Sequence, residues 1–326
     1  MQEFEQKIFH SITEEDFSSL AITLFNYQFF QNAVYQEYCK HLHVFPDKIK
    51  AIEEIPFLPV SFFKTHQVIS SSFVPEAIFS SSGTSGMQNA RHYVKSLSLY
   101  EKSFWESFRY FYGNPEQYTF LALLPGYLER EGSSLIYMME KMISRSTSPQ
   151  SGFYLYDHQK LYETLLSLKS SGKKTVLFGV SFALLDFAEQ YNIEFSDLII
   201  FETGGMKGRR REIVKEELHH ILKTAFGVKA IHSEYGMCEL LSQAYSQGNN
   251  VFETPPWMKL ILRDEKNPLL TSEQFTSGAV NVIDLANIYS CAFIATEDLG
   301  KKTTNGIEII GRLDNSEIRG CNLLVF

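Results

Sequence analysis

The sequence predicts an α/β fold in which helices cover a largely parallel sheet, with a helical N-terminal region and a β-rich C-terminal part. Three observations carry this prediction. Apolar residues recur at helical spacing through the first sixty residues, apolar runs alternate with helical patterns over residues 118–233, and short strands separated by turns follow Trp257. Strands that alternate with helices pair in parallel, because each helix carries the chain back across the sheet.

Composition sets the limits of this prediction. The 326 residues, 44% of them hydrophobic, are enough for one large unit, and the sequence shows neither a repeat nor a linker. A formal net charge of −8 with dispersed Lys and Arg argues against nucleic-acid binding. No basic leader precedes an apolar stretch, and no segment approaches the roughly 20 apolar residues of a membrane span. We therefore expect a cytoplasmic protein.

Each region contributes its own elements. Residues 14–39 repeat apolar side chains at helical spacing, and residues 47–52 predict a further turn or two before Pro56. We expect this N-terminal region to pack on the main body, and the 27 Phe and 17 Tyr to form an aromatic core. Further on, the patterns predict helices at residues 97–112, 133–144, 161–169, 182–190 and 211–225, and strands at residues 73–79, 118–124, 175–179, 198–202, 228–233, 258–262, 278–284, 290–296 and 307–310.

The strongest local signal for function is residues 80–86, Ser-Ser-Ser-Gly-Thr-Ser-Gly, which follow an apolar run. Glycines let backbone N–H groups approach an anion without a Cβ in the way, and hydroxyls add donors that adapt to phosphate oxygens. No lysine follows Gly86, so this is not the loop of the P-loop NTPases. The segment is a candidate triphosphate cradle, although an ordinary exposed loop explains such a run more often.

A second glycine segment follows the predicted strand at residues 198–202. It contains Thr203, Gly204 and Gly205, which would lie at the carboxyl end of a strand, where parallel sheets bind ligands. Paired glycines let a flat base lie against bare backbone. A tight strand-to-helix turn explains the same pair equally well.

The third segment contains Tyr235, Gly236, Met237 and Glu239, again after a predicted strand. The tyrosine can stack on a nucleobase, and the glutamate can hold a Mg²⁺ ion that bridges phosphate oxygens. Cys238 lies among carboxylates, which would raise its thiol pKa, so we expect it to be a buried small residue rather than a nucleophile.

Two more segments contain a charged residue each: the acidic Asp298 in residues 296–300 and the basic Arg312 in residues 311–314. An Asp before a turn can accept hydrogen bonds from both ribose hydroxyls, and a nearby Arg can donate to the sugar or the α-phosphate. Taken singly, each of these segments would be a turn.

Together and in this order, the five segments resemble the adenylate-forming superfamily of acyl- and aryl-CoA ligases, luciferases and nonribosomal adenylation domains. The resemblance covers residues 80–314 and implies a fold like the large N-terminal domain of those enzymes. It implies ATP and Mg²⁺ as cofactors and Glu239 as the metal ligand. By the same resemblance, ATP is bound by Ser81, Ser82, Gly83, Thr84, Ser85, Gly86, Thr203, Gly204, Gly205, Tyr235, Gly236, Met237, Asp298 and Arg312.

Three details are similar to the acyl-protein synthetase component of bacterial fatty acid reductase complexes: residues 81–86, residues 202–208 and the closing residues 316–322. The phenylacetate–CoA ligase group is the nearest alternative. The superfamily's small C-terminal domain should follow Asp314, whereas this sequence ends a dozen residues later. We therefore expect a large domain over residues 1–312, with residues 1–60 helical, and a hinge-like tail over residues 313–326.

The resemblance implies a two-step reaction, in which a carboxylic acid, expected to be a fatty acid, becomes acyl-AMP and then passes to a thiol. It assigns catalytic roles to Glu239 and to Cys321, which would be the acyl acceptor. CoA or a carrier protein stays open as the final acceptor instead. An acyl-protein reductase or an acyl acceptor protein is the implied partner. An acyl- or aryl-CoA ligase is one alternative, and an inactive nucleotide-binding partner subunit is another.

Overall fold

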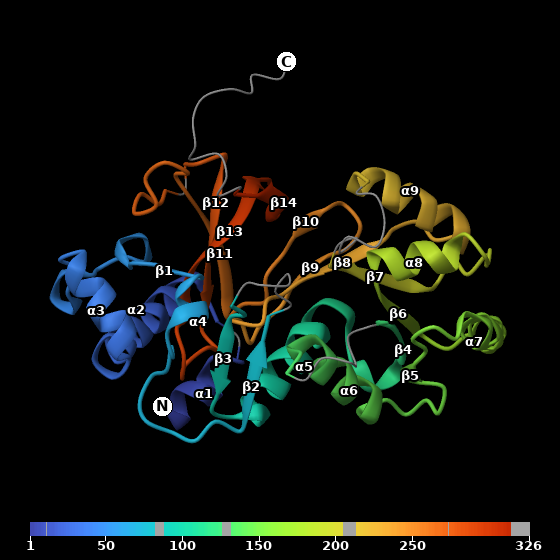
Figure 1. The fold of residues 1–326 in the computed structure, drawn as a ribbon, viewed down its shortest axis with the longest axis horizontal. Helices are drawn as coiled ribbons and strands as arrows, with labels where there is room; N and C mark the ends of the chain where they lie inside the picture. The colour runs from blue at the N-terminus through green and yellow to red at the C-terminus, as the bar shows by residue number, and fades with distance from the viewer. Residues whose placement is uncertain (11, 82–87, 126–131, 205–212, 273, 314–326) are drawn as a thin grey trace, which may run out of the picture.

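The computed structural model describes residues 1–10, 12–81, 88–125, 132–204, 213–272 and 274–313, which form three sheets and the helices around them (Figure 1). The central sheet has the strand order β5-β4-β6-β7-β8-β9. Its strands are β4 (Thr119–Leu123), β5 (Gly152–Phe153), β6 (Thr175–Val180), β7 (Ile199–Thr203), β8 (His232–Tyr235) and β9 (Ala244–Ser246). All neighbours pair in parallel except β8 and β9. The predicted parallel sheet is confirmed.

Helices cover both faces of this sheet. They are α5 (Leu97–Tyr112), α6 (Ser134–Arg145), α7 (His158–Ser171), α8 (Ser181–Ala188) and α9 (Lys215–Phe226). Figure 1 shows α8 and α9 on one side of the sheet and α5 and α6 on the other. Every residue of β4 and β6 is buried, which is why these strands read as continuous apolar runs.

The core between sheet and helices is aromatic, as predicted. The ring of Phe201 on β7 lies 5.4 Å from that of Phe178, 5.1 Å from that of Tyr112 and 5.6 Å from that of Tyr245, measured between centroids. Stacked and edge-to-face pairs of this kind add stability beyond the burial of their area.

A second sheet has the order β10-β14-β13-β12-β11 and confirms the β-rich C-terminal part. Its strands are β10 (Val251–Phe252), β11 (Met258–Arg263), β12 (Ser277–Asp284), β13 (Phe293–Lys302) and β14 (Ile307–Arg312), and β1 (Leu58–Pro59) pairs in parallel with β13. The reading of residues 296–300 as a turn is wrong. β13 runs straight through them, because β12 and β14 supply pairing partners on both sides and override the local composition.

The N-terminal region is helical, with α1 (Gln2–Lys7), α2 (Glu14–Gln31), α3 (Ala33–His41) and α4 (Phe62–Thr65). A capping box between Thr13 and Asp16 starts α2. The predicted turns at residues 47–52 are two separate 3-10 turns, Pro46–Lys48 and Ile52–Glu54.

These helices dock on the second sheet. The rings of Phe25 and Tyr35 pack against Phe293 on β13, with centroids 6.2 and 6.1 Å apart. The Gln28 side chain donates to the backbone oxygens of Asn287 and Ile288 at 2.9 and 3.0 Å. Packing on the main body is confirmed, while the expected domain boundaries stay a prediction.

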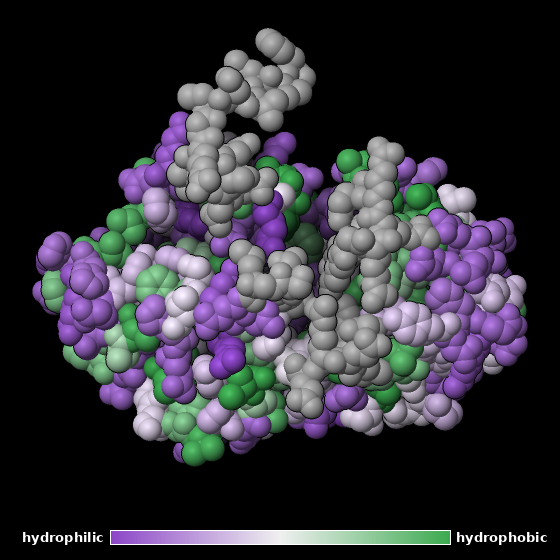
Figure 2. Space-filling model, viewed as in Figure 1, coloured by the Kyte–Doolittle hydropathy of each residue, from purple (hydrophilic) through white to green (hydrophobic). Residues whose placement is uncertain are grey.

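A short hairpin, β2 (Ala77–Ser80) and β3 (Arg91–Val94), forms the third sheet, so the strand predicted at residues 73–79 begins later than expected. Figure 2 shows hydrophilic residues gathered over the N-terminal helices at one end of this face and over the α7 to α9 end at the other. Within the described ranges, the helices all fall short of the length and apolarity that a bilayer crossing requires.

Candidate active site

The candidate site lies where the carboxyl ends of the parallel strands meet the second sheet. Thr203 ends β7 and Tyr235 ends β8, and these neighbouring strands run in parallel. Gly204 follows with φ +69°, a conformation that glycine adopts without strain. Loops at this edge of a parallel sheet are the usual place for a ligand. The rest of the glycine pair, Gly205, lies outside the described residues.

The structure brings Tyr235, Asp298 and Arg312 together from β8, β13 and β14. The Tyr235 hydroxyl donates to Asp298 Oδ2 at 2.7 Å, and Arg312 Nε donates to Asp298 Oδ1 at 3.2 Å. Burial, and then the neighbouring Asp298 carboxylate, raise the pKa of Tyr235 well above its ordinary value, so the phenol keeps its proton. Asp298 and Arg312 are also register partners across the two strands.

The ion pair within this triad joins an exposed side chain to a largely buried one. The Arg312 side chain is 74% exposed, whereas that of Asp298 is 12% exposed. Ion pairs with a solvated partner contribute only about 0–1 kcal/mol to folding. The Arg312 guanidinium is therefore accessible to a ligand, and the Asp298 carboxylate is fixed by its hydrogen bond from Tyr235.

Glu239, the predicted metal ligand, is buried close to the same place. Burial raises the pKa of its carboxyl group, and the positive charges of Lys64 and Arg312 act in the opposite direction. Its neighbour Cys238 is buried too, and burial followed by the charge of Glu239 raises the pKa of the thiol. The expectation that Cys238 is a buried and poorly ionised thiol is confirmed.

A single buried carboxylate fits Mg²⁺, because this ion is commonly held by one or two carboxylates plus substrate phosphates. Across the described ranges, no group of three or more His, Cys, Asp and Glu side chains gathers as a closed metal cage would require. Glu239 would hold the ion, and the remaining oxygens would come from phosphate and water.

Of the other predicted site residues, some are described by the structure and some lie outside the described ranges. Ser81 closes the base of the β2–β3 hairpin, where its Oγ accepts from the Ala90 N–H at 3.0 Å. Gly236 allows a close approach, since a Cβ there would come within 2.3 Å of Glu234 Oε1. The Met237 sulfur lies 4.0 Å from the Tyr235 hydroxyl. The residues Ser82, Gly83, Thr84, Ser85, Gly86 and Cys321 lie outside the described residues.

A buried polar cluster around Glu202, which the sequence patterns did not reveal, lies at the end of β7. Lys215 Nζ and His219 Nε2 from α9 lie 3.1 and 3.7 Å from Glu202 Oε1, and Ser233 donates to that oxygen at 2.9 Å. Burial alone would raise the pKa of Glu202, but the hydrogen bonds and the Lys215 charge lower it to about 2. This ionised carboxylate ties α9 to the strand ends. An acid two residues before the glycine pair is the only sequence signal for it.

A second missed group is Glu234, whose Oε2 accepts from the Thr203 hydroxyl at 3.2 Å. Burial raises its pKa to about 7. The folded state therefore binds this proton more tightly than the unfolded state, so stability falls as the pH rises from 4.5 to about 7.

We expect Glu234→Gln to stabilise the protein at pH 8 by up to roughly 3 kcal/mol, the size of the pKa shift, and to change little at pH 4.5. Urea unfolding at the two pH values measures this. Glu140→Gln, at an exposed position of α6, is the control and should be neutral at both. A Glu234→Gln variant less stable than wild type at pH 8 would contradict the assignment.

Two hollows among the described residues lie away from the triad. One of about 10 Å³ lies beside His92, Lys95 and Tyr289, and one of about 120 Å³ lies between the N-terminal region and the loop at Leu269. The smaller holds one water molecule at most. The strand-end residues, rather than these hollows, define the candidate site.

Comparison with known proteins gives one family-model match and a similarity of fold. A family model described as acyl-protein synthetase, LuxE, matches residues 12–100. No curated protein sequence matches the chain. The fold is similar to that of ATP-bound MatB from Rhodopseudomonas palustris, with a TM-score of 0.51 and 16% identity over 74% of this chain and 49% of that one.

Two other solved structures match at similar levels. The long-chain-fatty-acid-CoA ligase FadD1 from Archaeoglobus fulgidus has a TM-score of 0.51 and 12% identity over 72% of this chain and 51% of that one. The O-succinylbenzoate coenzyme A synthetase MenE from Bacillus subtilis, in complex with ATP and magnesium ion, has a TM-score of 0.50 and 15% identity over 91% of this chain and 63% of that one. The chain spans about half the length of the first of these structures. Its fold is similar to that of these ligase structures, and its residues 12–100 match the acyl-protein synthetase family model.

Proposed function

We propose that this protein uses Mg·ATP to activate a carboxylic acid, specifically a fatty acid, as acyl-AMP, and then passes the acyl group to a thiol. The observation that carries the proposal is the convergence of Tyr235, Asp298 and Arg312, with Glu239 in electrostatic reach of Arg312. A pair of ribose hydroxyls needs a fixed carboxylate, and triphosphate needs positive charge and a cation nearby. This group supplies the carboxylate of Asp298, the positive charge of Arg312 and, in Glu239, a ligand for the cation, beside a strand edge that suits a flat base.

The first step needs positioning more than acid–base chemistry. A carboxylate oxygen of the acid attacks the α-phosphorus of ATP, and the bond between the α-phosphorus and the bridging oxygen breaks to release pyrophosphate. A carboxylate is nucleophilic without a base, so the residues act by orientation and charge stabilisation. Asp298 would accept from the ribose hydroxyls on the lone pairs that Tyr235 and Arg312 leave free. Mg²⁺ held by Glu239 would neutralise charge on the leaving pyrophosphate.

In the second step a thiolate attacks the acyl carbon and AMP leaves. The three cysteines of the described ranges, Cys39, Cys238 and Cys291, are all buried, and burial raises each thiol pKa, that of Cys39 to about 12. Thiols of this kind are poor acceptors, because the thiolate is the nucleophile. Their inertness supports Cys321, which lies two residues after Arg319 in the sequence, as the acceptor.

Two alternatives lead to different products. If the acceptor is a diffusible thiol, the protein is an acyl- or aryl-CoA ligase. If no acid is activated, it is a nucleotide-binding partner subunit, which the retention of Glu239, Asp298 and Arg312 argues against. An acyl-protein reductase or acyl acceptor protein as partner, and the cytoplasm as compartment, belong to the same proposal.

ATP–pyrophosphate exchange tests the proposal, with a panel of fatty acids of different length, one aromatic acid and a reaction without acid. The proposal expects exchange that depends on a fatty acid and on Mg²⁺. Nucleotide binding without exchange under any of these conditions would instead establish the inactive-subunit alternative.

The phosphate loop can be tested by substitution. Gly83→Val should weaken ATP binding by about 10-fold or more, because a branched side chain would stand where phosphates approach backbone N–H groups. Calorimetry with ATP and Mg²⁺ measures the affinity, and Gly152→Val is the control, because this glycine of the edge strand β5 has open space around it and no positive φ. Unchanged affinity in Gly83→Val would move the phosphate site elsewhere.

A further inference from the structure

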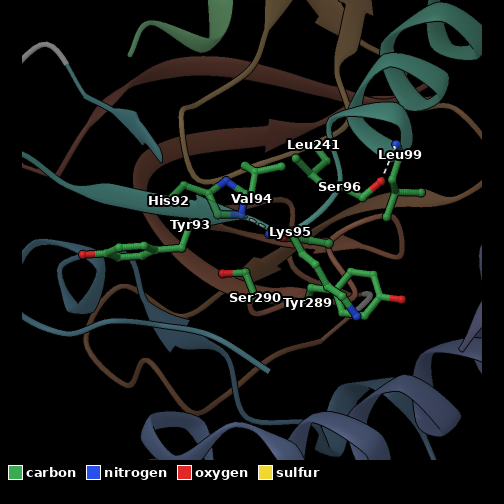
Figure 3. Close-up of a pocket in the computed structure, with 10 residues that line it drawn as sticks. His92, Tyr93, Val94, Lys95, Ser96, Leu99, Leu241, Tyr289 and Ser290 are labelled. Atoms are coloured by element: carbon green, nitrogen blue, oxygen red, sulfur yellow. Dashed lines mark hydrogen bonds between the residues drawn. The ribbon is translucent and has the colours of Figure 1, made fainter. Parts of the chain in front are cut away.

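A buried histidine holds the peptide that precedes the candidate metal ligand. His92 on β3 is 1% exposed, and its Nδ1 lies 2.8 Å from the backbone oxygen of Cys238. A carbonyl oxygen can only accept, so this contact is a hydrogen bond when Nδ1 carries the ring hydrogen. Figure 3 shows His92 among the side chains of Lys95, Tyr289 and Ser290, which line the small hollow beside it.

The peptide that follows Glu239 is held by a second buried side chain. Asn287, also 1% exposed, donates from Nδ2 to the backbone oxygens of Glu239 at 2.8 Å and of Cys291 at 2.9 Å. These two carbonyls fix the orientation of the amide, so Asn287 Oδ1 faces His92 Nε2 at 3.1 Å. The carbonyls on either side of the Glu239 Cα are thus bound by His92 and Asn287.

The protonation state of His92 and its two contact distances indicate which ring nitrogen donates a hydrogen bond. Burial lowers the pKa of His92 to about 4, so at neutral pH the ring carries one hydrogen. Both ring nitrogens face an accepting oxygen, and the shorter contact, 2.8 Å from Nδ1 against 3.1 Å from Nε2, assigns this one hydrogen to Nδ1. The bond from Nδ1 to the Cys238 carbonyl is therefore the one that acts at neutral pH.

The segment after Glu239 is tied down in the same manner. Asp284, which is fully buried, accepts from the N–H groups of Leu241 and Ser242 at 2.8 and 3.0 Å. Residues 236–243 lie between β8 and β9 and belong to no strand, so side chains satisfy backbone groups that a sheet would otherwise pair. The direction in which Glu239 points depends on these side chains.

We propose that His92 is a positioning residue that sets the orientation of the Glu239 carboxylate for Mg²⁺. The inference rests on the proposed function and extends it, because β3 lies directly after the candidate phosphate loop along the chain. One side chain thereby links the strand that leaves the phosphate loop to the peptide of the metal ligand. Outer-sphere partners of this kind typically change metal affinity or activity by 10- to 100-fold when removed.

Two substitutions separate this role from packing. His92→Phe fills the space and removes the donor, whereas His92→Asn places an amide N–H where Nδ1 lies. His232→Asn is the control, because His232 is partly buried, has like His92 a pKa lowered by burial to about 4, and contacts Tyr112 instead.

Mg²⁺ dependence of pyrophosphate exchange gives the first readout. We expect the Mg²⁺ concentration for half-maximal exchange to rise about 10-fold or more in His92→Phe and to return to within about 3-fold of wild type in His92→Asn. His232→Asn should lower the melting temperature without moving this concentration. A His92→Phe variant that loses stability but keeps the wild-type Mg²⁺ midpoint would overturn the proposal.

Amide hydrogen exchange of a peptide covering residues 236–243 gives a readout that needs no activity. Exchange should be faster in His92→Phe than in wild type and close to wild type in His92→Asn and His232→Asn. If the wild type shows no pyrophosphate exchange but the variants show this hydrogen-exchange pattern, the proposed function is wrong. The inference that His92 fixes the Glu239 peptide is then still supported. Unchanged protection in His92→Phe rejects the inference whatever the activity.

Discussion

Glu239→Gln is expected to lower acid-dependent pyrophosphate exchange on the order of 100-fold, the size typical of losing one charge-stabilising group at a reaction centre. The carboxylate is the charged oxygen ligand that the site offers Mg²⁺, and the amide that replaces it is neutral. Exchange measured over a range of Mg²⁺ concentrations is the test. Wild-type exchange by the variant at limiting Mg²⁺ would remove Glu239 from the metal site.

The same variant should be more stable than wild type at pH 8 without Mg²⁺ or ATP. Burial raises the pKa of Glu239, so the native state holds this proton more tightly than the unfolded state. Stability therefore falls as the pH rises from the ordinary glutamate value to the raised one, and glutamine carries no such penalty. Thermal melts should show the gain at pH 8 and its loss as the pH falls toward 4.5. Together, lost activity and gained stability separate a functional carboxylate from damage to the fold.

Cys321→Ser is expected to reduce thioester labelling to background while leaving pyrophosphate exchange largely intact. The thiolate is the nucleophile in the second step, and a serine hydroxyl is not ionised at neutral pH. Incubation with ATP and a labelled fatty acid should leave label on the wild-type protein that neutral hydroxylamine removes. A thioester that persists on the serine variant would show that another cysteine is the acceptor.

The buried cysteines supply the controls for this experiment. Cys238→Ser and Cys291→Ser should keep the label on the protein, because burial raises the pKa of both thiols and leaves them poor acceptors. Their cost should appear in stability, since a hydroxyl would replace a buried thiol. If the wild type gains no label but converts free CoA to acyl-CoA, the ligase alternative is correct.

The sequence predicted those elements whose pattern is local. The helix at residues 97–112 matches α5 residue for residue, because its amphipathic repeat is complete and Ser96 caps its start. The alternating strands and helices likewise identified the parallel sheet. Local patterns failed at residues 296–300, where the pairing of β13 with β12 and β14 decides the structure.

The structure brings together three of the predicted site residues, while their role in ATP binding stays a prediction. The resemblance carried by the ordered motifs predicted that Tyr235, Asp298 and Arg312 belong to one ATP site. In the structure, Tyr235 and Arg312 both contact Asp298. Nothing in the sequence near Glu239 pointed to His92 or Asn287, because they reach it from distant segments through a buried network. Contacts of this kind follow from the tertiary fold alone.

Isotope transfer from the acid tests the central claim, the formation of acyl-AMP, most directly. The protein would be incubated with ATP, Mg²⁺ and a fatty acid whose carboxylate carries ¹⁸O, and the nucleotide and phosphate products analysed by mass spectrometry. Attack on the α-phosphorus predicts one ¹⁸O in the AMP released when the acyl group passes to a thiol, and none in pyrophosphate. Recovery of ADP with ¹⁸O in inorganic phosphate would show attack on the γ-phosphorus and contradict the account.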